Sequence, residues 1–136
     1  TATTTLSLKN MMGALATKGI MHRGMSLHEN IADLASVLKP SLAVVDGIIA
    51  GQGHENSFDP IQMNLIIAGS DPVAVDAVGA AVMGVDPTEV KHLVLAEKKG
   101  LGTANLNQIT ILGEPIEKVQ RKFNRSIASK VLVHFG

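Results

Sequence analysis

Three short stretches along the chain are rich in apolar residues. The runs at 42–46 and 64–68 are apolar on both faces and are followed directly by Gly47 and Gly69. Such runs are typical of strands in a parallel sheet that helices cover on both sides. A third run at 108–112 predicts a further strand.

Between these runs, apolar residues recur with helical spacing. Ser26 and Glu29 have the spacing of a capping box, in which each side chain bonds the other residue's backbone N–H. The apolar residues that follow share one face, and Lys39-Pro40 ends the pattern. We therefore expect a helix that begins after Ser26 and ends at about Lys39.

A local repeat predicts two more helices. Gly69-Ser-Asp71-Pro72 recurs fifteen residues later as Gly84-Val-Asp86-Pro87. In each copy Asp suits the N-cap and Pro suits the first helical position. We expect helices from Pro72 to about Met83 and from Pro87 to about Lys99, with a short helix at 116–123.

Strands that alternate with helices indicate an α/β fold. We predict three layers, namely a mainly parallel sheet with helices on both faces. The chain is expected to form a single α/β domain over 1–136 that is a fragment of a larger domain or protein. Residues 131–135 could be a final strand or part of a linker, and 114–136 as a whole a linker or an edge segment.

The composition excludes several classes of function. The chain of 136 residues is 46% hydrophobic and 2% aromatic, with zero net charge and no Cys. The chain has neither the net positive charge nor the aromatic surface that favour binding of nucleic acid. Without Cys, it cannot ligate an iron–sulfur cluster through thiolates. No apolar run reaches 18 residues and no secretory signal opens the chain. We expect a cytoplasmic protein with no nucleic-acid or membrane partner.

Acidic residues gather in the middle of the chain, where 40–90 holds seven and no Lys or Arg. These could be helix caps, or they could form an acidic site. Ligands of open α/β sheets lie beyond the carboxyl ends of the strands. Asp46 ends one predicted strand and Asp71 follows another, and a polar loop at 51–57 comes after Asp46. These residues are therefore candidates for a site.

Asp76 lies within an otherwise apolar helical stretch, where an unpaired carboxylate is costly. It could be a structural acid that bonds nearby backbone or the Lys9 ammonium. Alternatively, it could face the crevice at the strand ends and act there as an acid or base. In the functional alternative it opens into the same crevice as Asp46.

The five histidines show no metal-binding spacing. His22 and His54 lie in predicted glycine-containing loops, so they are the better candidates for ligand contacts. His28 and His92 fall in predicted helices and are expected to be structural or exposed. No nucleotide-binding glycine motif is present, and we expect no metal.

Many short motifs, in order over about residues 4–113, resemble the domain-of-unknown-function-362 family. Among them are Ser7-Leu-Lys9-Asn10, Val45-Asp46-Gly47-Ile48, Gly69-Ser-Asp71-Pro72-Val-Ala-Val-Asp76 and Gly100-Leu-Gly102. The chain is similar to the C-terminal part of that domain. It departs from the family at 51–60, where a Gly-Pro pair is missing.

Five residues match polar positions of the family, and the resemblance implies that they have a role in function. They are Lys9, Asn10, Asp46, Asp71 and Asp76. Members often carry ferredoxin-type domains with iron–sulfur clusters. Any such cluster would belong to a part of the full-length protein outside this chain. We expect no cofactor in this chain itself.

We therefore expect an enzyme-like protein with a small-molecule site at the strand ends. Asp46, Asp76 and Lys9 are the catalytic candidates, and Asn10, His22, His54 and Asp71 the substrate-binding candidates. The alternative is a non-catalytic scaffold that docks a ferredoxin-type domain through its basic C-terminal third. That surface would use five residues, namely Lys118, Arg121, Lys122, Arg125 and Lys130.

Overall fold

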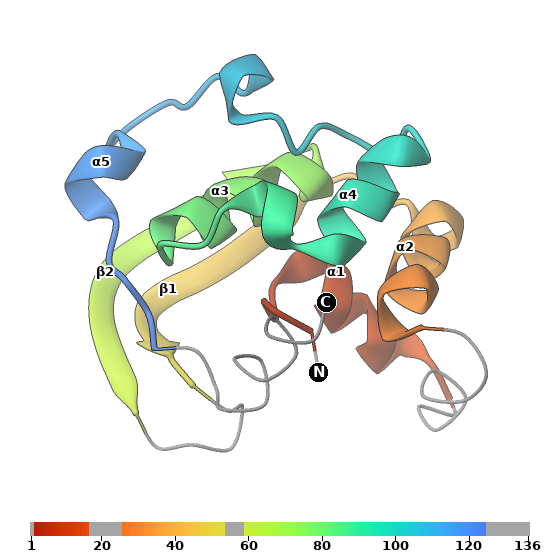
Figure 1. Cartoon of the computed structure of the whole chain (residues 1–136), viewed down its shortest axis with the longest axis horizontal. Coiled ribbons are helices and arrows are strands. Elements are labelled where there is room, and N and C mark those ends of the chain that lie inside the picture. The colour runs from red at the N-terminus through yellow and green to blue at the C-terminus, as the bar shows by residue number, and fades with distance from the viewer. Residues whose placement is uncertain (1, 17–25, 54–58, 125–136) are drawn as a thin grey trace.

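The computed structural model describes residues 2–16, 26–53 and 59–124. Two strands form a curved ribbon, and the α-helices gather mainly on one side of it (Figure 1). The elements, in which η marks a 3-10 helix, are α1 (Ser7–Asn10), η1 (Met11–Ala14), α2 (Leu27–Leu38), β1 (Ala43–Gly51), β2 (Pro60–Gly69), α3 (Pro72–Val82), η3 (Pro87–Glu89), α4 (Lys91–Lys98), η4 (Leu106–Gln108) and α5 (Ile116–Val119).

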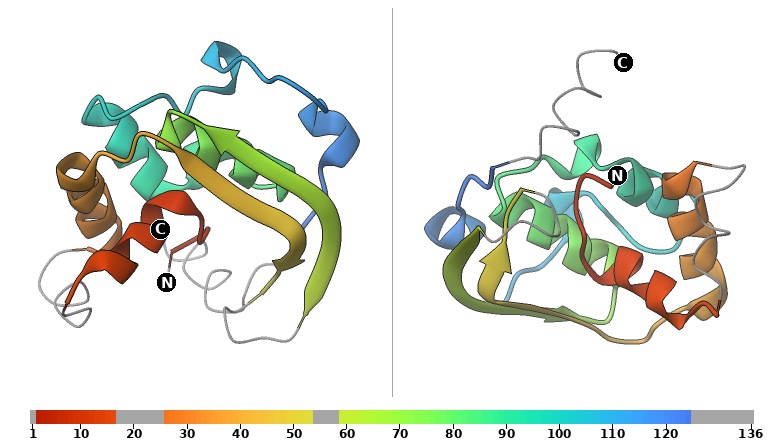
Figure 2. Two further views of the ribbon diagram at one scale, coloured as in Figure 1. Left: turned by 180° about the vertical axis from the view of Figure 1, so that it is seen from behind. Right: turned by 90° about the horizontal axis from the view of Figure 1, so that it is seen from below.

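The sheet differs from the prediction. Its two described strands are antiparallel and α3 packs on one face, so the expected three-layer, mainly parallel sheet is wrong. Seen from behind, the other face of the ribbon has no described helix over it (Figure 2). Val44 and Ile66 on that face are 59% and 62% exposed. Each strand has apolar residues on both faces, but only the face towards α3 is covered by a described helix.

Both strands are longer than the apolar runs predicted. Gly47 does not end β1, because the strand continues through it to Gly51. A bulge follows Gly47, and Asn64 on the partner strand has a φ of 53°. A Cβ on Gly47 would lie 2.7 Å from the Cδ1 atom of Leu65, so glycine here permits the close approach of its neighbour.

The predicted helix caps are confirmed. The Ser26 hydroxyl accepts from Glu29 N, and the Glu29 carboxylate accepts from Ser26 N, which completes the capping box. Asp71 and Asp86 both cap the elements that follow them. The second helix of the repeat is interrupted, because η3 ends at Glu89 and α4 begins only after Val90.

The core lies among the helices rather than under the outer face of the ribbon. Leu8 of α1, Ile31 of α2, Val73 of α3 and Leu93 of α4 are fully buried in one cluster. Small side chains along α3 allow its neighbours to approach on several sides, and nine of its eleven residues are buried. This core fixes α1 beside α3, and the candidate site depends on that arrangement.

The predicted third strand at 108–112 is also wrong. Residues 106–108 form η4, and the segment after it is extended but belongs to no strand of the described chain. The predicted strand or linker at 131–135 lies outside the described residues.

Candidate functional site

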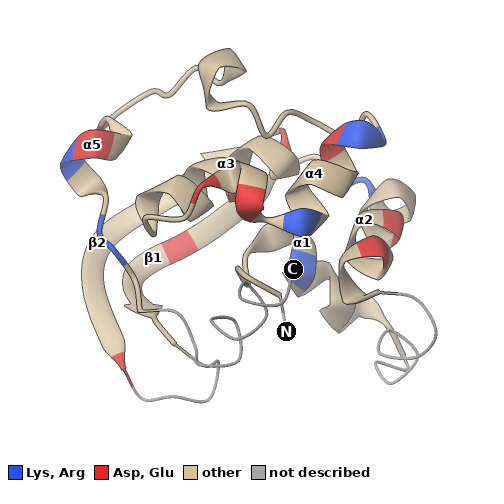
Figure 3. Ribbon diagram, viewed as in Figure 1, with Lys and Arg blue, Asp and Glu red and all other residues tan. Residues whose placement is uncertain are grey.

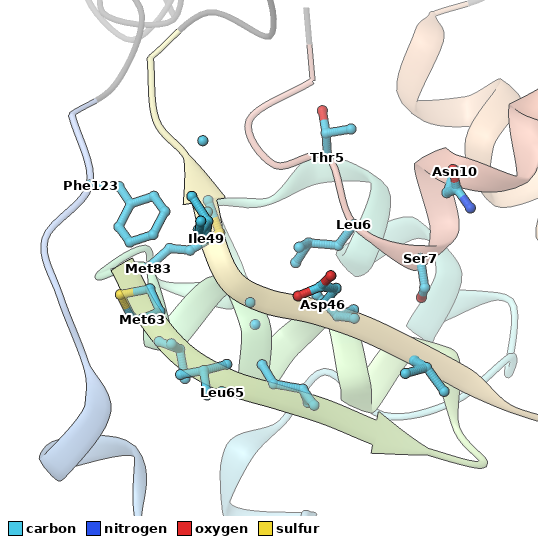
Figure 4. A pocket seen from close by; sticks show the side chains of 18 residues that line it. Thr5, Leu6, Ser7, Asn10, Asp46, Ile49, Met63, Leu65, Met83 and Phe123 are labelled. Atoms are coloured by element: carbon cyan, nitrogen blue, oxygen red, sulfur yellow. The ribbon is translucent and has the colours of Figure 1, made fainter. Parts of the chain in front are cut away.

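A cavity of about 310 Å³ lies between the N-terminal segment and β1. Its polar lining comes from Thr5, Ser7, Asn10 and Asp46 (Figure 4). The rest of its wall is mainly apolar and includes Leu6, Ile49, Met63, Leu65, Met83 and Phe123. The cavity therefore combines a small polar group with a larger apolar surface, as ligand-binding sites generally do.

Asp46 supplies the acidic group of this cavity from the middle of β1 (Figure 3). Its Oδ1 atom accepts a hydrogen bond of 2.9 Å from Ile48 N, at the bulge of the strand. Its Oδ2 atom has no hydrogen-bond partner among the described residues, and the side chain is exposed. The carboxylate is thus oriented by its own strand and retains an open acceptor.

Asp76 is fully buried and caps α1 across the fold. Its Oδ1 accepts from Ser7 N at 2.8 Å and from the Ser7 hydroxyl, and its Oδ2 accepts from Leu8 N at 3.0 Å. Burial raises the pKa of Asp76 above its ordinary value, and the hydrogen bonds from Ser7 and Leu8 oppose that rise. Since α1 has no cap from its own N-cap residue, Asp76 provides the acceptors that its first N–H groups need.

These contacts favour the structural alternative for the Asp76 side chain itself. Asp76 is not among the residues that line the cavity. Ser7, however, both lines the cavity and donates to Asp76. Asp76 therefore contacts a residue of the cavity wall but does not itself line the cavity that contains Asp46.

Asp71 has a different position, at the start of α3. Its Oδ1 accepts from Val73 N and Ala74 N at 2.8 and 3.0 Å, and its Oδ2 accepts from Thr103 N at 2.9 Å. The carboxylate thereby joins α3 to the segment after α4. It lines a second cavity beside β2 and does not line the one that contains Asp46.

The remaining candidates are only partly brought together. Asn10 lines the cavity directly, whereas Lys9 does not line it and its ammonium donates to the Thr5 hydroxyl at 2.9 Å. His22 and His54 lie outside the described residues. Within the described part of the chain, no three His, Asp or Glu side chains are grouped to hold a metal ion.

Two features of the structure were not recognised in the sequence. One is the role of Ser7, the first residue of α1, whose hydroxyl donates to Asp76 across 69 positions of the chain, a contact that no local pattern indicates. The rings of His28 and His92 stack with centroids 5.8 Å apart and planes 9° apart. Single-sequence spacing does not reveal this pair, since the two residues are on different helices.

Comparison with known proteins places the chain in a family. The chain belongs to the domain-of-unknown-function-362 family, whose model matches residues 1–81. It is also similar to the thylakoid-associated protein sll1697 of Synechocystis sp., with 27% identity over 125 residues. That alignment covers 86% of this chain and 39% of the relative, so the chain spans about two fifths of the relative's length. No solved structure matches.

The described helices are all short. The longest, α2, has 12 residues, and none in the described ranges has the length and apolar character of a membrane span.

Proposed function

We propose that this domain binds a small molecule in the cavity between the N-terminal segment and β1. The observation that carries the proposal is the position of Asp46, which has an Oδ2 without a partner among the described residues and lines a space together with two hydroxyls, one amide and apolar side chains. Concave, mainly apolar spaces with a few polar groups are the usual form of small-molecule sites.

The lining favours a ligand with a hydrogen-bond-donating head and an apolar body. A carboxylate accepts hydrogen bonds, so Asp46 would pair with an ammonium or hydroxyl group of the ligand. Asn10 and Ser7 would contact the same head group, while Leu6, Leu65 and Phe123 would contact its apolar part. No Lys or Arg lines the cavity among the described residues, which disfavours an anionic ligand.

Two candidate residues, Asp76 and Lys9, act in this proposal by positioning other residues that line the cavity. Asp76 positions Ser7 and the start of α1, and Lys9 positions the Thr5 hydroxyl. Both are positioning residues, because neither side chain lines the cavity. His22 and His54 remain predicted contacts.

The test is a ligand-observed NMR screen of fragments grouped as amines, alcohols and carboxylic acids. We expect amines with apolar tails to bind, and to shift the amide signals of residues 5–10 and 43–51. Asp46→Asn retains the acceptor for Ile48 N but removes the charge, and it should weaken binding of the amines by roughly tenfold, equivalent to about 1.4 kcal/mol. Asp59→Asn, which changes an exposed carboxylate that does not line the cavity, is the matched control.

Equal binding to the wild type and Asp46→Asn would overturn the proposal, as would a preference for carboxylic acids. Shifts confined to other parts of the chain would also overturn it.

A second candidate function is the docking of a ferredoxin-type domain in the cytoplasm, with any iron–sulfur cluster held by that domain. The observation in its favour is that Lys118, Arg121 and Lys122 are all exposed at and after α5. Lys118 also pairs with Glu114 at 3.1 Å. Docking of this kind would weaken steeply with added salt, whereas binding of an amine with an apolar tail in the cavity would weaken less.

A further inference from the structure

The segment 109–112 after η4 is extended and mainly apolar but unpaired, and it ends at a bend at Gly113. Ile109 has β-region angles of −101° and 121°, and Ile111 and Leu112 are 38% and 91% exposed. No backbone hydrogen bond joins residues 110–113 to any other residue in the described ranges. The segment has the conformation and sequence of a strand without the partner that a strand requires.

A second open edge lies opposite this segment. Within the described chain β2 pairs only with β1, so its far edge presents unpaired N–H and C=O groups. Between that edge and 109–113 lies a cavity of about 660 Å³, larger than the one that contains Asp46. In Figure 1 the segment passes from η4 to α5 beside α3.

The walls of this cavity suit a polypeptide strand. One wall is the edge of β2 at 64–69 and the other is 109–113, while Val75 and Val78 of α3 form an apolar floor. A strand placed here could hydrogen-bond on both of its edges and rest its side chains on α3. Main-chain pairing gives such additions their affinity, and side-chain pockets give their specificity.

We infer that this groove accepts an extended, apolar strand, which pairs with β2 on one side and with 109–113 on the other. This chain spans 39% of the length of the Synechocystis relative. The strand that fills the groove is a segment equivalent to one in the remaining part of that relative. The β1–β2 ribbon then becomes a four-stranded sheet. A two-stranded ribbon is marginal by itself, and three or more strands with an apolar face are stable.

The inference is independent of the proposed ligand cavity, because the two spaces lie on opposite edges of the ribbon. Apart from residues of β2, only Val82 lines both spaces. A failure of either proposal would therefore leave the other standing.

The test uses synthetic 12-residue peptides that tile the sequence of the Synechocystis relative outside the aligned region. Since main-chain atoms make the pairing, divergence between the two proteins should be tolerated. Fluorescence anisotropy identifies a peptide that binds this chain, and NMR-detected hydrogen exchange maps the amides that it protects. We expect new protection in 64–69 and in 110–113 together.

Two changes test the geometry. N-methylation of alternate residues of the bound peptide removes the donors of one edge, and it should weaken binding at least tenfold whichever edge is blocked. Thr110→Pro removes a donor from the segment and should weaken binding similarly. Val37→Lys changes an exposed apolar residue on α2 and should leave binding unchanged.

Three results would overturn the inference. The first is that no peptide of the set binds, and the second is that protection is confined to one of the two edges. The third is concentration-dependent self-association that protects 64–69 and 110–113 without peptide, which would make a second copy of this chain the occupant.

Discussion

Acid should destabilise this protein through the stacked pair of His28, which is half-buried, and His92, which is fully buried. His92 is fully buried, and neither of its ring nitrogens has a hydrogen-bond partner among the described residues. Burial, and secondarily the charges of His28 and Lys9, lower the pKa of His92 from 6.5 to about 4. Burial and the charge of Lys91 lower the pKa of His28 as well.

The direction in which stability changes with pH depends on whether the folded or the unfolded chain binds the proton more readily. Below pH 6.5 the unfolded chain takes up a proton at His92, while the folded protein resists it until about pH 4. The contribution of neutral His92 to stability is therefore complete above pH 6.5 and is lost as the pH falls towards 4. At 1.36 kcal/mol per pH unit the whole effect is about 3 kcal/mol, of which about 2.5 kcal/mol is lost by pH 4.5.

Urea unfolding of the wild type and of His92→Leu, at pH 7.5, 6.0, 5.0 and 4.5, measures this effect. Leucine removes the titrating ring and breaks no hydrogen bond of the described chain. The variant should gain about 2.5 kcal/mol relative to the wild type between pH 7.5 and 4.5. Ile31→Val on the facing helix is the control, and it should cost about 1 kcal/mol at every pH. A constant difference between the wild type and His92→Leu would refute the reasoning.

Three further substitutions test contacts described above. Asp76→Asn turns an amide NH₂ towards Leu8 N or Ser7 N, so it should lower the free energy of unfolding by about 1–3 kcal/mol; an unchanged urea midpoint would contradict this. Ser26→Ala removes the capping box of α2 and should cost about 1 kcal/mol in urea unfolding, whereas Ser26→Thr should retain most of the stability. Gly102→Ala would drive a methyl group into the Asp71 carboxylate and should cost about 1–3 kcal/mol by thermal unfolding, while Gly13→Ala, with open space around its Cβ position, should not.

Local features were more predictable from the sequence than the arrangement of the sheet. The capping box at Ser26 and the caps at Asp71 and Asp86 depend on residues within three positions of each other, and all were confirmed. The strand direction was wrong because apolar runs such as 42–46 have the same pattern in a covered parallel strand as in an antiparallel ribbon with an exposed apolar face. Burial, which separates the two, depends on packing between distant segments.

In the candidate site, too, contacts between distant segments were less predictable from the sequence than local features. Asp46 and Asn10 are both site candidates from the sequence, and both line the cavity. The sequence left open whether Asp76 was structural, and its capping of α1 depends on a contact across 69 positions that no local spacing encodes. The apolar residues of 109–112 favour an extended backbone, which the segment has. It is not a strand, because no strand of the described chain pairs with it.

The cap of α1 also bears on the order in which the protein folds. A four-residue helix has no independent stability, and α1 receives its cap from a side chain of α3 rather than from its own sequence. The N-terminal segment can therefore settle only after α3 exists and presents Asp76. Closing a loop of this length is entropically costly, so the contact forms late. The segment that contains α1 is in this way among the last parts of the described chain to acquire its native structure.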